Sequence, residues 1–187
     1  MKKLAVLLVA VLFAAPAFAG DAGILKLSLW DNIAVALPNN TNHVTGVNLG
    51  IGAKTDKVDG VQLDLISSKA GKVRGINTAY IYSTAHELYG VQGGIYNTTD
   101  IAVGLQGGLV AVNHQEITGL QGGAINIAKG EVTGVQLGLY NQVADLHGLQ
   151  LGLVNNAHHI SKGLQLGIVN IAKNGWLPVM VLVNGRF

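Results

Sequence analysis

Hydrophobic and polar residues alternate along most of the chain, and the alternation recurs every 14 or 15 residues. Each copy reads glycine, aliphatic, glutamine or asparagine, then usually a small or aliphatic residue, a second glycine and an apolar pair. The nine copies start at Gly46, Gly60, Gly75, Gly90, Gly104, Gly119, Gly134, Gly148 and Gly163. Alternation at period two is typical of β-strands, and a 15-residue copy leaves no room for a helix beside its strand. The pattern therefore predicts an all-β repeat protein.

A short-repeat β-solenoid is the first arrangement that fits these copies. Each copy of 14–15 residues would form one coil, and equivalent residues would stack about 4.8 Å apart. Aliphatic residues such as Leu149, Leu151 and Leu153 would then fill the interior. An aliphatic residue two positions before the glycine would join them, as in Val44, Val58, Val73, Leu88, Ile117, Val132 and Leu146. The asparagines near the ends of the copies would form a hydrogen-bonded ladder at a corner: Asn126, Asn141, Asn155 and Asn170.

A small outer-membrane up-and-down β-barrel of about 10–12 strands is the alternative arrangement. The leucine face would then meet lipid, and the alternating segment that ends at Phe187 resembles the C-terminal signal of barrel proteins. However, the apolar band from Leu149 to Leu153 spans roughly 13 Å, whereas such barrels present a band about 25 Å tall. Aromatic residues make up only 5% of the chain, which is few for two aromatic girdles. These magnitudes favour the solenoid.

The N-terminus has the features of a secretory signal peptide. Lys2 and Lys3 precede an apolar run, and Ala17-Phe18-Ala19 offers small residues for cleavage after Ala19. The remaining chain then has ten basic and ten acidic residues, so its charge gives no support for binding nucleic acid. The chain contains no cysteine. We expect a signal peptide at 1–19, an N-terminal strand or cap region at 20–45, the repeat array at 46–177 and a C-terminal strand at 178–187.

Two columns of the predicted solenoid are candidate interaction surfaces. If the leucines are inside, a column of amides lies on the surface and is a candidate binding face for a polymer such as a glycan, or a self-satisfied structural ladder. This candidate binding face consists of Gln92, Gln106, Gln121, Gln136, Gln150 and Gln165. Four residues further on lies an apolar column that calls for a partner such as a second subunit. This candidate interface stripe consists of Tyr96, Val110, Ile125, Tyr140, Val154 and Val169.

The sequence offers no group of residues with the spacing of a catalytic or metal site. The histidines fall in connections before the repeat glycines, and the adjacent His158 and His159 would point apart on an extended chain. Asp64 is a lone carboxylate that we expect to be solvated, and no acid pair, nucleophile elbow or phosphate loop recurs. We therefore expect no enzymatic activity, no cofactor, and no catalytic, cofactor-binding or metal-binding residues.

The copies at Gly134, Gly148 and Gly163, with the ending from Asn174 to Phe187, resemble bacterial surface-repeat proteins with GLQxGLxN-type repeats. The resemblance covers about residues 46 to 187, and it implies a Gram-negative envelope location without an established activity. We expect an exported, non-enzymatic envelope protein that acts as a structural or binding scaffold in the periplasm, in the outer membrane or on the cell surface. The alternative is an outer-membrane β-barrel, for example a pore. The candidate partners are a second copy and an envelope glycan or protein, with no role for nucleic acid.

Overall fold

The computed structural model describes residues 22–39 and 42–187, which leaves the predicted signal peptide outside the described residues. The described residues form a single sheet of seven strands in the order β2-β1-β3-β4-β5-β6-β7. The strands are β1 (Gly23–Trp30), β2 (Ile33–Leu37), β3 (His43–Ala79), β4 (Tyr82–Leu137), β5 (Tyr140–Leu151), β6 (Val154–Ala172) and β7 (Val179–Arg186). None of the described segments is a helix that is long and apolar enough to cross a membrane.

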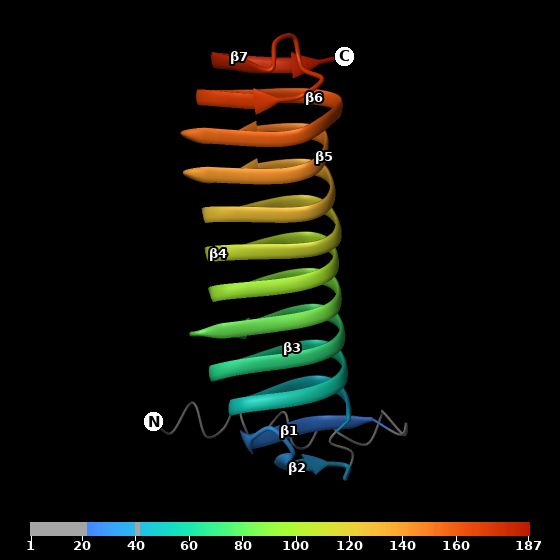
Figure 1. Cartoon of the computed structure of the whole chain (residues 1–187). Coiled ribbons are helices and arrows are strands. Elements are labelled where there is room, and N and C mark those ends of the chain that lie inside the picture. Colours follow the sequence, from blue (N-terminus) through green and yellow to red (C-terminus); the bar gives the residue numbers. More distant parts are fainter. Residues whose placement is uncertain (1–21, 40–41) are drawn as a thin grey trace, which may run out of the picture.

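The chain winds into a β-solenoid, in which long strands such as β3 and β4 continue through several coils (Figure 1). Neighbouring coils pair in parallel with equivalent residues side by side, for example Gly75 with Gly90 and Gly134 with Gly148. The predicted all-β solenoid is therefore confirmed. The alternative up-and-down arrangement is wrong because it requires antiparallel neighbours, and the pore hypothesis depended on that arrangement. We number the coils 1 to 9 from the nine repeat glycines, Gly46 to Gly163.

Antiparallel strands cover both ends of the solenoid. At the N-terminal end, β1 pairs in parallel with β3 and antiparallel with β2. At the C-terminal end, β7 pairs antiparallel with β6, so that Gln165 lies beside Asn184. Figure 1 shows the two end strands closing the rod. β1 and β7 hydrogen-bond to backbone groups of the first and last coils, which would otherwise be open to pairing with another chain.

A narrow apolar column forms one part of the core. The residues two positions before the repeat glycines are fully buried, as the sequence predicted: Val44, Val58, Val73, Leu88, Ile117, Val132 and Leu146 all have at most 1% of their surface exposed. Small residues lie beside them and keep the two walls of each coil close together: Ala70, Ala85, Ala102, Ala128, Ala157 and Ala172. The aliphatic column and these alanines make up most of one continuous hydrophobic cluster.

The orientation of the two strand faces is the opposite of the one expected from hydrophobicity. Leu139 and Leu153 are 58% and 49% exposed, and Leu149 and Leu151 are only half-buried. The prediction that these leucines fill the interior is wrong. The amides point inward instead, and none of the predicted binding-face glutamines exposes more than 1% of its surface: Gln92, Gln106, Gln121, Gln136, Gln150 and Gln165. The expected polar binding face therefore does not exist as a surface.

The glycines explain why this inverted arrangement fits. Gly134 has a φ of +137°, and a Cβ there would collide with the carbonyl oxygen of Gly119 in the preceding coil. The second glycine of the copy, Gly138, faces inward, where a Cβ would lie 2.5 Å from the side-chain nitrogen of Asn126. Only glycine leaves space at these two positions for the stacked backbone and for the buried amides.

Candidate functional site

A continuous glutamine ladder runs through the interior of the rod. From coil 5 onwards, the Nε2 of each glutamine donates to the Oε1 of the glutamine one coil earlier. The N···O distance is 2.7 Å from Gln136 to Gln121 and also 2.7 Å from Gln150 to Gln136. A buried amide is costly only when its hydrogen-bonding groups lack partners, and the repeat supplies those partners. The ladder is thus a structural element of the core.

An asparagine ladder runs beside it, as the sequence predicted. The Nδ2 of Asn126 donates to Asn141, which donates to Asn155, which donates to Asn170, over 2.8 to 2.9 Å. Each asparagine also donates to a backbone carbonyl, as Asn141 does to Leu151. Donation in this ladder runs towards the C-terminus, whereas donation in the glutamine ladder runs towards the N-terminus. The two rows of amide dipoles therefore oppose each other.

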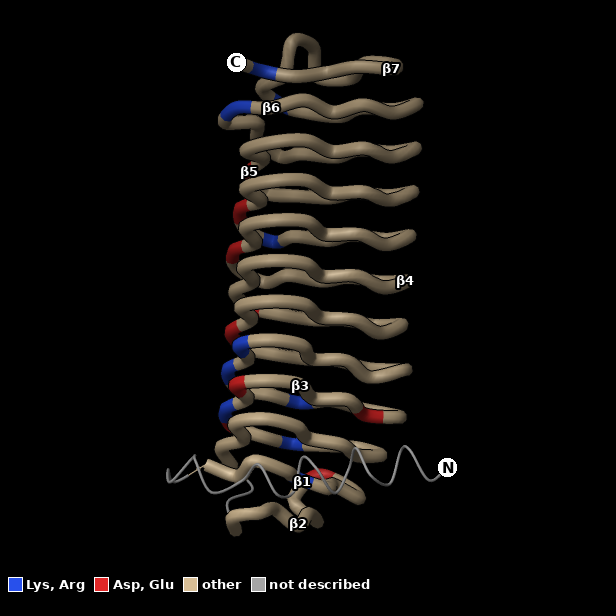
Figure 2. The backbone as a smooth tube through the Cα atoms, turned by 180° about the vertical axis from the view of Figure 1, so that it is seen from behind, with Lys and Arg blue, Asp and Glu red and all other residues tan. Residues whose placement is uncertain are grey.

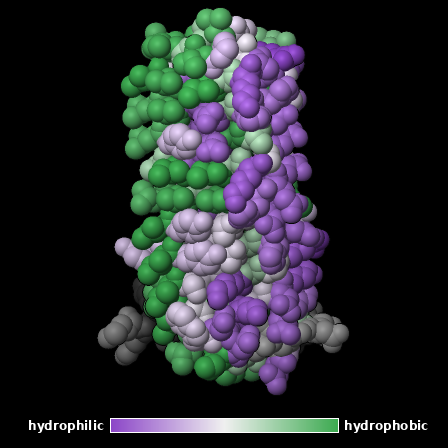
Figure 3. Space-filling view, viewed as in Figure 1, coloured by the Kyte–Doolittle hydropathy of each residue, from purple (hydrophilic) through white to green (hydrophobic). Residues whose placement is uncertain are grey.

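The strands whose inward side chains form the ladders carry a continuous apolar face on their outer side. We define the apolar face as the positions one, three and five residues after each repeat glycine. It includes the exposed residues Ile51, Leu63, Leu65, Ile76, Tyr80, Val91, Ile95, Leu105, Leu109, Leu137, Leu139, Leu153, Leu166 and Ile168. Figure 3 shows hydrophobic residues gathered along one side of the rod and hydrophilic residues along the opposite edge.

The predicted interface stripe adjoins this face, one residue beyond its last position. Tyr96 and Ile125 are 38% and 40% exposed, and the other four members are half-buried. The stripe and the apolar face together form one surface. Nine strands at about 4.8 Å make it about 43 Å long, and five residue steps at about 3.3 Å make it about 17 Å wide. This area of about 700 Å² exceeds the largest apolar patch of a typical soluble monomer.

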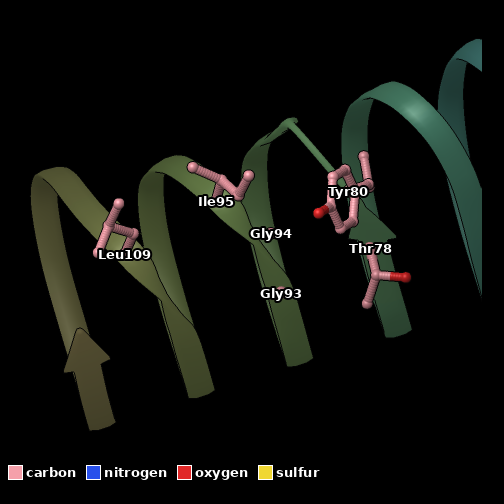
Figure 4. A pocket seen from close by; sticks show the side chains of 7 residues that line it. Thr78, Tyr80, Gly93, Gly94, Ile95 and Leu109 are labelled. Carbon is pink, nitrogen blue, oxygen red and sulfur yellow. The ribbon is translucent and has the colours of Figure 1, made fainter. Parts of the chain in front are cut away.

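A shallow groove crosses the middle of the apolar face. The third position after the repeat glycine is itself a glycine in coils 4 to 6, at Gly93, Gly107 and Gly122. A Cβ at Gly122 would meet no atom within 4 Å, and one at Gly107 would meet only a carbonyl oxygen at 4.0 Å. Figure 4 shows Tyr80, Ile95 and Leu109 from successive coils beside the Gly93 end of this groove. A pocket of about 560 Å³ opens at that end, between Thr78 and Leu109. At Gly93, Gly107 and Gly122 the surface of the face is backbone.

Charged residues gather on the opposite edge, in the connections before the repeat glycines (Figure 2). Several form ion pairs between neighbouring coils, including Lys72 with Glu87 at 2.5 Å and His86 with Asp100 at 2.8 Å. In the part of the chain that the structure describes, no three His, Asp or Glu side chains come together in a group that could hold a metal ion. This edge therefore consists of solvated ion pairs that stabilise the stacking of the turns by small amounts each.

A buried lysine and a buried carboxylate lie at the N-terminal end of the core. Only 8% of Asp64 is exposed, and burial raises its pKa to about 6, although hydrogen bonds from Gln62 and Ser68 and the charge of Lys26 act to lower it. Burial also lowers the pKa of Lys26, against the raising effect of Asp64 and Asp56. The Nζ of Lys26 donates to Thr55 Oγ1 at 2.8 Å and to the carbonyl of Lys54.

The expectation that Asp64 is solvated is wrong, and the sequence did not single out Lys26. The repeat itself indicates that Asp64 is buried. Asp64 lies two residues after an amide, at the inward position that is glycine or alanine in the other coils. Once the amides are placed inside, the period of two places Asp64 inside as well.

No family model, curated protein or solved structure matches the chain. The fold and the surface together define a β-solenoid with an amide-ladder core and one apolar face.

Proposed function

We propose that this protein is an exported, non-enzymatic component of the bacterial cell envelope that serves as a rigid scaffold and acts by burying its apolar face on a partner. The observation that carries the proposal is the apolar face itself, which runs along all nine coils while the interior is lined by amides. A surface of this kind is stable in water only at a considerable cost, and that cost is removed when a partner covers it.

The regularity of the repeat supports a scaffold rather than an enzyme. Catalytic sites are irregular because they bring unlike groups together with perturbed pKa values. Among the described residues, the largest pKa shift falls on Asp64, and both Asp64 and Lys26 lie inside the core rather than in an open cleft. The hydrogen bonds of Lys26 tie it to the first coil and make a structural role the simplest explanation.

The features of residues 1–19 support export. A positive start, an apolar run and small residues before the expected cleavage point are what a signal peptidase reads. The repeats also resemble those of bacterial surface proteins, which agrees with an envelope location. A glycan is a weaker candidate partner than a protein or lipid surface because the glutamine column that would bind it is buried.

Fractionation of a Gram-negative host that expresses the full chain tests this proposal. The test variant replaces Leu65, Leu109 and Leu153 on the apolar face with serine, and the matched control replaces Lys129, Glu116 and Glu131 on the charged edge with serine. We expect the wild-type and control proteins to lose residues 1–19 and to occur in envelope fractions or in assemblies. The apolar-face variant should be exported equally but recovered as a free monomer in the periplasm. Retention of the wild type in the cytoplasm, or identical distribution of all three proteins as monomers, would contradict the proposal.

A further inference from the structure

If the proposed function holds and a partner covers the apolar face, the residues of that face indicate which partner it is. We propose that it binds a second copy of this chain, in an antiparallel two-fold dimer in which three leucines of each copy fit over three glycines of the other. The inference depends on the order of large and small residues along the face and on the area that the face can bury.

Large and small residues are segregated along the middle column of the face. Read from coil 1 to coil 9, the third position after the repeat glycine is Leu49, Leu63, Thr78, Gly93, Gly107, Gly122, Leu137, Leu151 and Leu166. Three glycines in coils 4 to 6 are thus followed directly by three leucines in coils 7 to 9. The glycine segment is a groove with open space above it, and Leu137 and Leu166 project from the leucine segment with 38% and 39% exposure.

A two-fold axis that lies in the interface plane, parallel to the strands and between coils 6 and 7, makes these two segments complementary. Coil 6 then faces coil 7 of the second copy, coil 5 faces coil 8, and coil 4 faces coil 9. Leu137 of each copy lies over Gly122 of the other, and Leu151 lies over Gly107 in the same way. Because the interface is isologous, every such contact occurs twice. A parallel two-fold arrangement does not give this fit, since it sets each coil against its own equivalent and therefore leucine against leucine and glycine against glycine.

The flanking columns are also matched under this axis. The two-fold rotation sets the first position of one copy against the first position of the other, and the fifth position against the fifth. Leu105 then faces Leu149, and Leu109 faces Leu153. The facing pairs of coils 4 to 9 are apolar on both sides throughout, so that the rotation places no charged side chain in the interface. Packed sheets of this kind lie about 10 Å apart with interdigitating side chains.

The area is sufficient for a stable dimer. The same axis brings coil 3 opposite β7, which extends the overlap to eight strands, or about 38 Å at 4.8 Å per strand. With a width of about 17 Å, each copy buries roughly 650 Å² and the dimer about 1,300 Å². Stable specific interfaces bury about 1,200 to 2,000 Å² in total.

A lipid surface explains the pattern less well. Hydrocarbon chains are fluid and favour a uniformly bulky apolar surface, whereas this face has glycines at its centre. Removing three large side chains where contact would be deepest weakens insertion into a membrane. The absence of these side chains strengthens association only with a folded protein surface whose projecting side chains fit over the glycines.

The first experiment measures the monomer–dimer equilibrium of the mature full-length protein in dilute buffer by sedimentation. The variant Gly107→Leu fills the groove on an open surface, so it leaves the fold intact, and we expect its dimer dissociation constant to rise at least 100-fold. The double variant Gly107→Leu with Leu151→Gly exchanges the two partners and should recover most of the wild-type affinity. Within one chain these two residues lie three coils apart, so a structural effect of Gly107→Leu would not be reversed by a change at residue 151, which faces it only in the dimer.

A matched pair of charges tests which coils overlap. Leu151→Asp lies within the overlap and should abolish dimerisation. Leu63→Asp lies in the same column of coil 2, outside the overlap, and should change the dissociation constant less than threefold. If the two-fold axis lay at the middle coil instead, coil 2 would face coil 8 and both variants would abolish the dimer. Equal effects of the two variants would therefore overturn the proposed register.

Spin-label distances then measure the register directly, because the chain has no cysteine and a single added cysteine is labelled uniquely. Lys173→Cys in coil 9 and Lys69→Cys in coil 2 lie away from the apolar face. The two Lys173 labels should be separated along the rod by five coil steps, or about 24 Å, and the two Lys69 labels by nine steps, or about 43 Å. A longer distance at Lys173 than at Lys69, or similar short distances at both positions, would contradict the register.

The same preparations distinguish failure of this inference from failure of the proposed function. One possible result is a wild-type protein that is monomeric both at high concentration and after 100-fold dilution, but that floats with neutral phosphatidylcholine vesicles. That result would overturn the dimer and leave the scaffold proposal standing. A protein that remains monomeric, ignores the vesicles and is free in the periplasm would overturn both. A dimer whose affinity follows the exchange of residues 107 and 151 is the expected result.

Discussion

Replacement of Gln136 by leucine is the sharpest test of how the core is stabilised. Gln136 donates to the Oε1 of Gln121 and accepts from the Nε2 of Gln150, both over 2.7 Å. Leucine has a similar volume but leaves one buried acceptor and one buried donor without partners. Each orphaned group costs about 1–3 kcal/mol, and the apolar gain of leucine offsets part of the sum. We expect the free energy of unfolding to fall by about 2–4 kcal/mol.

Gln165→Leu at the C-terminal end of the ladder is the matched control. Gln165 donates to the Oε1 of Gln150 at 2.8 Å, and its own Oε1 accepts no hydrogen bond. Its replacement therefore orphans one side-chain group of the ladder, whereas replacement of Gln136 orphans two. The assay is urea unfolding followed by far-ultraviolet circular dichroism at a fixed protein concentration. A Gln136→Leu protein that is as stable as the wild type, or no less stable than Gln165→Leu, would refute the reasoning.

Three further predictions concern single positions. Gly134→Ala places a Cβ against the carbonyl of Gly119 at a positive φ, and should lower the unfolding free energy by at least about 2 kcal/mol in urea titrations. Leu63→Ser lies on the apolar face and should change the unfolding free energy by less than about 1 kcal/mol, while the solubility limit rises. Because the pKa of Asp64 is raised from 3.8 to about 6, the folded state binds its proton more tightly than the unfolded state. The contribution of Asp64 to stability should therefore be greatest below about pH 4 and fall by up to about 3 kcal/mol towards pH 7, and Asp64→Asn should remove this contribution in pH-resolved unfolding.

The sequence was sufficient to predict the architecture because the repeat is a nearest-neighbour pattern. The steps of 14 or 15 residues allow only a short coil, and the aliphatic residues such as Leu146 and the asparagines such as Asn141 occupy the positions expected for them. The parallel stacking of equivalent residues follows from the same repeat. These features depend on local spacing, which a single chain displays fully.

The orientation of the strand faces could not be predicted from hydrophobicity. A period of two shows that two sets of side chains face opposite ways, but it does not show which set is inside. Hydrophobicity alone places Leu149 inside and Gln150 outside, whereas a self-satisfied ladder removes the usual penalty for burying an amide. The variation of each column between copies is the better indicator of which set of side chains is inside. The column that contains Gln150 is an amide in every coil, whereas the column that contains Leu151 varies between leucine, threonine and glycine.

The measurement that most directly tests the central claim compares the thiol reactivity of two adjacent residues in a chain that has no cysteine of its own. Gln62 is fully buried and Leu63 is 43% exposed, and both lie in coil 2, outside the proposed dimer overlap. We predict that Leu63→Cys reacts with a maleimide nearly as fast as the unfolded protein does, and that Gln62→Cys reacts at least 100-fold more slowly. The reverse order, with a protected residue 63 and a reactive residue 62, would contradict the amide-core solenoid.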